Sequence, residues 1–134
     1  LYIIRLSDYW GPVNDTPEWR QQQASAFDHH GGEVETSVQL AACPDLVHMD
    51  AVTAPGNPLP RLNHLPPVLA PINWYAAHPN HYAGDARAAT KAKGEFLLPR
   101  YAQKVATILT AVKADTAAPA IQADHFRRRR HGPP

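Results

Sequence analysis

Proline is the residue that most limits how this chain can fold. Seven of its fourteen prolines fall within residues 55–79, together with Gly56, Asn57 and Asn63. Because proline fixes φ and lacks a backbone N–H, this stretch can form neither a regular helix nor a central strand. Long segments without regular structure are often lids or subunit contacts, and are otherwise disordered. We therefore expect residues 55–79 to form a long loop or arm.

The residues before this loop read as alternating strand and helix. Residues 1–6 are apolar and β-branched, which predicts a buried strand, and Gly11-Pro12 is expected to break the element that follows. Thr16 is a capping hydroxyl and Pro17 suits the first helical position, so a helix is expected to run to about Ala26. A strand, a helix, a loop and a second helix together favour a layered α/β fold.

After the loop, Asp85 is expected to cap one long helix that reaches about Lys113. Pro99 should bend or break this helix, because proline removes a helical hydrogen bond. Residues 115–134 include four arginines and read as a disordered basic tail, which leaves residues 1–114 as the folded part. The predicted helix carries an apolar stripe that indicates a core face: Leu98, Tyr101, Val105, Ile108, Leu109 and Val112.

Charge and cysteine content exclude several classes of protein. Without Arg127–Arg130 the chain has 9 basic residues against 12 acidic ones, so its charge does not favour nucleic-acid binding. No apolar run approaches the roughly 18 residues that span a bilayer, so we expect no membrane partner and a cytoplasmic location. Cys43 is the single cysteine, which fits a reducing compartment. We interpret it as a small buried core residue rather than a nucleophile.

The stretch that carries chemistry is residues 28–37, Asp-His-His-Gly-Gly-Glu-Val-Glu-Thr-Ser. Its glycine pair permits a tight turn, and Glu33 and Glu35 fall in the first turn of the helix expected next. His30 precedes that helix on the loop, so an imidazole that can carry a proton faces carboxylates that can hold a cation. Glu33 could equally cap the helix or pair with a basic group. The spacing alone is a weak metal signal.

Residues 30–37 resemble the His-Ala-Gly-Glu-x-Glu-Thr-Ser signature of the creatininase (creatinine amidohydrolase) family. A second stretch, Gly84-Asp85-Ala86-Arg87-Ala88-Ala89-Thr90 with Lys93-Gly94, resembles the family's Gly-Asp-Pro-x-x-Ala-Thr…Lys-Gly segment. The two motifs stand in the family's order and together cover roughly residues 1–114. The resemblance implies a layered α/β/α fold and hydrolysis of a linear or cyclic amide C–N bond.

The resemblance also implies roles for particular residues. It makes His30 the catalytic histidine, Glu35 the better metal ligand and Glu33 the second, at a centre of zinc or manganese. Metal ions lower the pKa of bound water and polarise a carbonyl, which suits amide hydrolysis. Tyr82, on a loop that the resemblance places beside the active site, is expected to contact a small-molecule amide substrate. Trp10 is expected to do so as well, because it follows the predicted strand where an α/β fold presents its pocket. Aromatic packing at a strand exit is the alternative for Trp10.

The chain also departs from the family. The remaining metal ligands have no counterpart, and Gly31 replaces the usual alanine. Because the chain also opens inside a predicted strand, we expect it to be the C-terminal part of a longer protein, inactive alone. The family resemblance implies a homo-oligomer, a hexamer. One alternative is a non-catalytic remnant that acts as an assembly or interaction protein, and a weaker one is a basic-tailed RNA-binding module.

Overall fold

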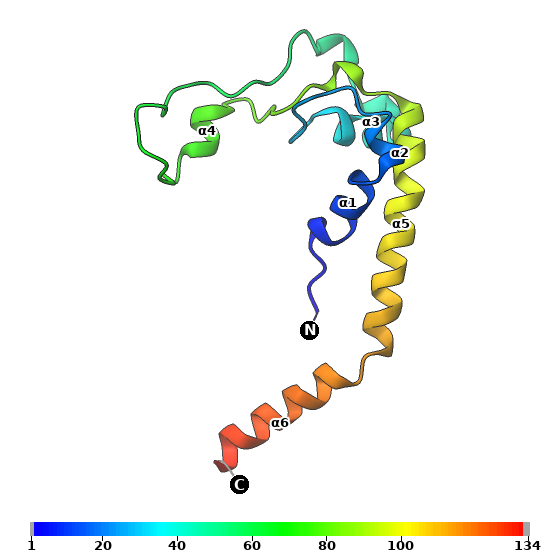
Figure 1. The fold of residues 1–134 in the computed structure, drawn as a ribbon, viewed down its shortest axis with the longest axis vertical. Helices are drawn as coiled ribbons and strands as arrows, with labels where there is room; N and C mark the ends of the chain where they lie inside the picture. Colours follow the sequence, from blue (N-terminus) through cyan, green and yellow to red (C-terminus); the bar gives the residue numbers. More distant parts are fainter. Residues whose placement is uncertain (1, 133–134) are drawn as a thin grey trace.

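The regular structure of the chain is helical. The computed structural model describes residues 2–132 (Figure 1). Within these limits the strand-like pairing is confined to one isolated antiparallel bridge, between Asp28 and Gly84. The helices are α1 (Leu6–Asn14), α2 (Pro17–Arg20), α3 (Glu33–Ala42), α4 (Asn73–Ala77), α5 (Lys91–Ala114) and α6 (Ala117–His131), with 3-10 turns η1 (Pro44–Leu46), η2 (Met49–Ala51) and η3 (Ala86–Ala88).

The predicted N-terminal strand is wrong in the part that the structure describes. Residues 2–5 belong to no helix or strand, and Leu6 begins α1, while Leu1 lies outside the described residues. Asp8 explains the helix start, because its carboxylate accepts the backbone N–H of Arg5 at 3.0 Å. The helix also continues through Gly11-Pro12, where a break was predicted. A layered α/β arrangement is therefore not confirmed.

The helix predicted from Thr16 begins as expected but is short. The Thr16 hydroxyl accepts the backbone N–H of Trp19 at 3.4 Å, and Pro17 occupies the first helical position. The helix ends at Arg20 instead of Ala26. The N–H groups up to Gln23 still bond to carbonyls of α2, but those of Ala24 and Ser25 bond to the Glu33 carboxylate, so the helix does not extend to Ala26.

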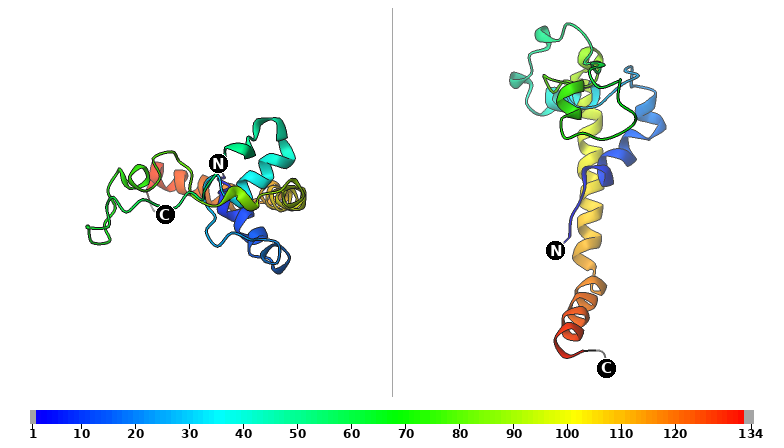
Figure 2. Two further views of the ribbon diagram at one scale, coloured as in Figure 1. Left: turned by 90° about the horizontal axis from the view of Figure 1, so that it is seen from above. Right: turned by 90° about the vertical axis from the view of Figure 1, so that its left-hand side faces the viewer.

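The core forms where α3 lies against the N-terminal half of α5, with α1 and α2 alongside (Figures 1 and 2). The two helices approach so closely that a Cβ on Gly94 would lie 1.9 Å from the Ser37 carbonyl oxygen. The Ser37 hydroxyl also accepts the backbone N–H of Thr90 at 3.1 Å. Five buried side chains make up the hydrophobic core around this contact: Val13, Trp19, Val34, Leu97 and Tyr101.

A buried ion pair joins the same two helices. Lys93 Nζ donates to Glu33 Oε1 at 2.5 Å and to the Ala88 carbonyl at 2.9 Å. The Glu33 side chain is 0% exposed and that of Lys93 is 16% exposed. Glu33 also accepts the backbone N–H groups of Ala24 and Ser25, at 2.6–3.1 Å. One carboxylate therefore ties the loop after α2, helix α3, turn η3 and helix α5 together.

The C-terminal helices differ from the sequence predictions in three ways. Asp85 caps the short turn η3, and α5 begins later, where the Thr90 hydroxyl accepts the backbone N–H of Lys93. Pro99 lies within α5, which continues unbroken to Ala114. Of the predicted apolar stripe only Tyr101 is buried, and Leu109 is exposed, whereas the fully buried Leu97 was not part of that prediction.

Residues 117–131 form helix α6 rather than a disordered tail. Alanine, the best helix former, occurs repeatedly in its first half. Asp124 pairs with Arg127 and, at 2.7 Å, with Arg128, at the spacings that place side chains together on a helix. Figure 1 shows that α6 continues beyond the end of α5 and lies away from the core.

The proline-rich stretch runs out from the core as an arm that holds α4 (Figures 1 and 2). We use the word arm for residues 52–82, which include this stretch and the residues that return from it. Residues 52–72 form turns and irregular structure, as proline content predicts. Residues 73–77 form the short helix α4, although no helix was predicted within 55–79, because this segment lies between Pro71 and Pro79 and contains no proline. Cys43 is exposed, contrary to the predicted burial, because α3 ends at Ala42 and Cys43 caps it. Among the described helices, none combines the length and apolar character needed to cross a membrane.

The Glu33–Lys93 pair makes a prediction about stability. Replacing Glu33 with glutamine leaves the Lys93 ammonium without its counter-ion, so the free energy of unfolding should fall by about 3 kcal/mol. Glu95→Gln is the matched control, because Glu95 pairs with Lys91 at 3.7 Å on the exposed face of α5, the helix that carries Lys93. An exposed pair of this kind contributes at most about 0.5 kcal/mol. Urea denaturation of both variants measures the difference.

The same pair predicts a pH dependence. Burial raises the pKa of Glu33, but hydrogen bonds from Lys93, Ser25 and Ala24 outweigh it and hold the pKa below the ordinary value of 4.5. Because the folded-state pKa is lower, ionised Glu33 stabilises the fold, and this stabilisation is fully present above the unfolded-state pKa of about 4.3. The stabilisation is lost as the pH falls through the folded-state pKa. The difference in free energy of unfolding between wild type and Glu33→Gln should be constant from pH 8 to pH 5 and should decrease below about pH 4.5. A gap that stays constant down to pH 3 would contradict this ionisation.

Candidate active site

The loop that carries His30 is held by side chains of the helix that follows it. Gly31 has φ +70°, a left-handed conformation that glycine adopts without strain. Its N–H donates to Glu35 Oε2 at 2.7 Å, and its carbonyl accepts the Thr36 hydroxyl at 2.9 Å. The turn between His30 and α3 is thus closed by two bonds from the first turns of the helix.

His30 and Glu35, both predicted as site residues, lie together. Nδ1 of His30 is 3.3 Å from Glu35 Oε2, the same oxygen that accepts the Gly31 N–H. The imidazole is 60% exposed and the carboxylate 31% exposed, so both can be reached from solvent. The His30 carbonyl accepts the backbone N–H of Ala83 at 2.8 Å, which fixes the main chain below the ring.

Asp28 caps α3, a role that the sequence analysis did not identify. Its carboxylate accepts the backbone N–H of Val34 at 3.2 Å. Burial raises the pKa of Asp28, and the neighbouring charges of Glu33 and Glu35 act in the same direction. Asp28 stands four residues before Gly32, the N-cap residue of α3, so the local capping rule gives no signal for this bond.

Trp10, His30 and Glu35 line one cleft, of about 710 Å³, between α1, α3 and α5. The same three residues also border a second cleft of about 330 Å³, which Asp28 and Trp74 complete. Trp10 thus lies at the predicted site, although on a helix rather than at a strand end. Its ring also packs on Tyr101, with centroids 5.7 Å apart, so the packing role that we considered for it holds as well.

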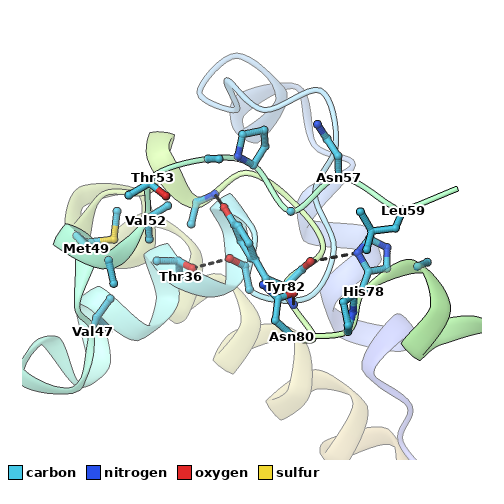
Figure 3. Close-up of a pocket in the computed structure, with 18 residues that line it drawn as sticks. Thr36, Val47, Met49, Val52, Thr53, Asn57, Leu59, His78, Asn80 and Tyr82 are labelled. Atoms are coloured by element: carbon cyan, nitrogen blue, oxygen red, sulfur yellow. Dashed lines mark hydrogen bonds between the residues drawn. The ribbon is translucent and has the colours of Figure 1, made fainter. Parts of the chain in front are cut away.

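Tyr82 lines a different pocket, of about 590 Å³, which Figure 3 shows. Gly31 and Thr36 border both this pocket and the cleft of about 710 Å³. Its hydroxyl accepts the backbone N–H of Ala86 at 2.9 Å, and its carbonyl bonds to Nδ1 of the buried His78 at 3.1 Å. Tyr82 therefore joins the arm to η3. The structure does not bring it into the cleft of His30 and Glu35.

Two residues of the arm do reach His30. The ring centroids of Trp74 and His81 lie 6.4 Å and 6.5 Å from that of His30, both at steep angles. No site role was predicted for Trp74 from the sequence. Lys93 was quoted only as part of a motif, although it is the partner of Glu33.

The donor groups present do not make the metal site that the resemblance implies. Among residues 2–132, no three His, Cys, Asp or Glu side chains cluster so that they could hold a metal ion. Both oxygens of Glu33 are hydrogen bonded within the core, so this predicted ligand is not directed at His30. His30 and Glu35 are two donors, whereas catalytic zinc usually takes three from the protein.

The backbone of the His30 loop gives a prediction of its own. Gly31→Ala places a Cβ at ordinary contact distance, 3.4 Å from the Tyr82 ring, so its cost is the left-handed backbone alone. We expect the free energy of unfolding to fall by about 1–2 kcal/mol.

Gly11→Ala is the control for this change, because it lies in α1 and its Cβ would meet nothing within 4 Å. Alanine there should raise the free energy of unfolding by about 0.5–1 kcal/mol. Thermal or urea denaturation compares the two variants. Equal stability of Gly31→Ala and wild type would show that the loop takes an alanine without strain.

Known proteins provide independent comparisons. The family model Creatininase, described as creatinine amidohydrolase, matches residues 4–109. Among solved structures, "Putative creatinine amidohydrolase from Bacteroides fragilis NCTC 9343" is similar, with 27% sequence identity and a TM-score of 0.55. The similarity covers 74% of this chain and 39% of that one, so this chain spans well under half of the protein it matches. A search of curated proteins found no match.

The family match includes the features that build the site. Residues 4–109 contain α1 with Trp10, the His30 loop, α3, the arm and most of α5. The two sequence motifs that carried the resemblance meet in the structure, through the Glu33–Lys93 pair and the contact of Ser37 with Thr90 and Gly94. The chain belongs to the creatininase family.

Proposed function

We propose that this chain supplies the proton-transferring histidine of an amidohydrolase that cleaves a linear or cyclic amide C–N bond. The observation that carries the proposal is the contact between His30 and Glu35, 3.3 Å apart beside a cleft that Trp10 also lines. Membership of the creatininase family supports the reaction class. The cleft is open to solvent and large enough for a small amide.

The pair can act by ordinary acid–base chemistry. A carboxylate facing Nδ1 favours the tautomer with the proton on that nitrogen, which leaves the Nε2 lone pair free to accept a proton. His30 can then take a proton from the attacking water and return it to the leaving nitrogen. Glu35 stabilises the imidazolium formed between the two steps. We therefore assign Glu35 to the orientation of His30 and Glu33 to the α3–α5 junction.

Dependence on zinc or manganese, which the family resemblance implies, belongs to this proposal. His30 and Glu35 face each other, and no further donor completes a site around them in that part of the chain. Metal analysis of the protein tests this directly. A stoichiometric metal that survives Glu35→Gln would support a ligand set elsewhere.

The exposed apolar side chains of the arm favour a second role, in assembly. Leu69 is 95% exposed, and the other large apolar side chains there, each at least 40% exposed, are Leu59, Leu65, Val68, Ile72, Trp74 and Tyr75. Side chains of this kind in one segment are typical of interaction surfaces. Homo-oligomerisation through the arm is compatible with catalysis, or replaces it if the chain is a non-catalytic assembly protein.

The catalytic proposal predicts the effect of removing His30. In the full-length protein, His30→Ala should lower kcat for amide hydrolysis by about 10²–10⁴-fold, because general acid–base catalysis contributes about that much. Creatinine and a panel of simple linear and cyclic amides are the substrates to use. Glu35→Gln should lower kcat less, since the imidazole stays while its charged partner is lost.

His64→Ala is the matched control, because His64 is an exposed histidine on the arm. Its turnover should equal that of wild type. Unchanged turnover in His30→Ala would remove His30 from the reaction. Absence of turnover in wild type and all variants, with a stable oligomer, would favour the assembly role.

A further inference from the structure

A hydrogen-bonded pair of side chains on the arm stands beside His30. The indole Nε1–H of Trp74 donates to Nδ1 of His81 at 3.0 Å. Both rings lie edge-to-face with the His30 ring, at interplanar angles of 70° for Trp74 and 80° for His81. Steep, edge-to-face arrangements at such distances are favourable between aromatic rings. The Trp74–His81 pair therefore packs against one side of the His30 imidazole, the candidate catalytic group.

The hydrogen bond fixes the chemistry of His81. An indole N–H can only donate, so the His81 nitrogen that it contacts must be the unprotonated acceptor. In the neutral ring the proton then lies on Nε2. The bond also sets the orientation of the indole, because rotation of Trp74 away from His30 would break it.

The backbone around the pair is shaped to bring the two rings together. The N–H of His81 donates to the His78 carbonyl at 3.0 Å, and the N–H of His78 donates to the Trp74 carbonyl at 2.7 Å. These turns give His81 a φ of 62°, a left-handed conformation unusual for any residue but glycine. His78 is buried beneath the pair, and its ring lies 4.9 Å from that of Trp74. A strained residue held by several bonds is a fixed feature of the arm.

We propose that Trp74 and His81 are positioning residues for His30. Glu35 holds the Nδ1 end of the imidazole, and the Trp74–His81 pair limits rotation of the ring, so that its proton-accepting nitrogen keeps one direction. This inference rests on the proposed function of His30 and adds to it a role for the arm. The arm thereby completes the site, although it lies up to 51 residues after His30 in sequence.

Three variants test the pair. Trp74→Phe keeps an aromatic ring but removes the N–H donor, and His81→Ala removes the acceptor. Each should lower kcat about tenfold with KM unchanged, as expected when a catalytic group is misplaced. His81→Asn should keep kcat within about threefold, because asparagine tolerates a positive φ and its side-chain oxygen can accept the indole N–H.

Tyr75→Phe is the control, since Tyr75 is the exposed neighbour of Trp74 on α4 and lies 5.9 Å from Arg61. Its kcat and KM should equal those of wild type. A rise in KM at constant kcat in Trp74→Phe would overturn the proposal, because the pair would then bind substrate instead of positioning His30.

A second measurement does not depend on activity. Side-chain ¹⁵N NMR of the histidines should show an unprotonated Nδ1 on His81 and should detect changed His30 ring signals in Trp74→Phe and His81→Ala, but not in His81→Asn or Tyr75→Phe. Unchanged His30 signals in Trp74→Phe would overturn the positioning role. Shifted signals in a protein that hydrolyses no amide would support the positioning of the ring and refute the proposed function, so the two failures are distinguishable.

Discussion

The buried carboxylate of Glu33 is the constraint on which the rest of the structure depends. A buried carboxylate is stable only when it is paired and hydrogen bonded. Glu33 meets that condition with Lys93 and two backbone N–H groups, at Ala24 and Ser25. These partners come from two separate stretches of the chain, and Glu33 itself lies on a third. Satisfying one charge therefore fixes where the loop after α2, helix α3 and helix α5 must meet.

The His30 site is built outward from that junction. Glu33 faces the core and Glu35, two residues later, faces the loop, where it holds Gly31 and approaches His30. Two carboxylates that look equivalent in sequence therefore have different roles, one in folding and one beside the reactive group. The arm also contributes to this site, because the rings of Trp74 and His81 lie beside the His30 ring.

Local signals in the sequence predicted part of this arrangement. The Thr16 cap, the start of α3, the arm and the proximity of His30 to Glu35 follow from capping residues, glycine and proline, whose effects act within a few residues. The family resemblance, which the comparisons confirm, came from two short motifs. Its residues Glu33 and Lys93 prove to be in contact, which no single motif could show.

The failed predictions are those in which distant contacts override local preference. Residues 1–6 have the composition of a strand, but in the described residues no partner strand lies beside them and Asp8 starts a helix instead. The helix after Thr16 does not extend to Ala26, because the N–H groups of Ala24 and Ser25 bond to the distant Glu33 instead. Trp74 escaped assignment because its neighbour in space, His30, is 44 residues away in sequence.

A double-mutant cycle on Glu33 and Lys93 tests the central claim most directly. It compares the free energies of unfolding of wild type, Glu33→Gln, Lys93→Met and the double variant at pH 7. If the buried pair organises the fold, the double variant should be more stable than the sum of the single changes predicts, with a coupling energy of about 2–3 kcal/mol. Single effects that add to within about 0.5 kcal/mol would contradict the account, because residues without a shared interaction behave additively.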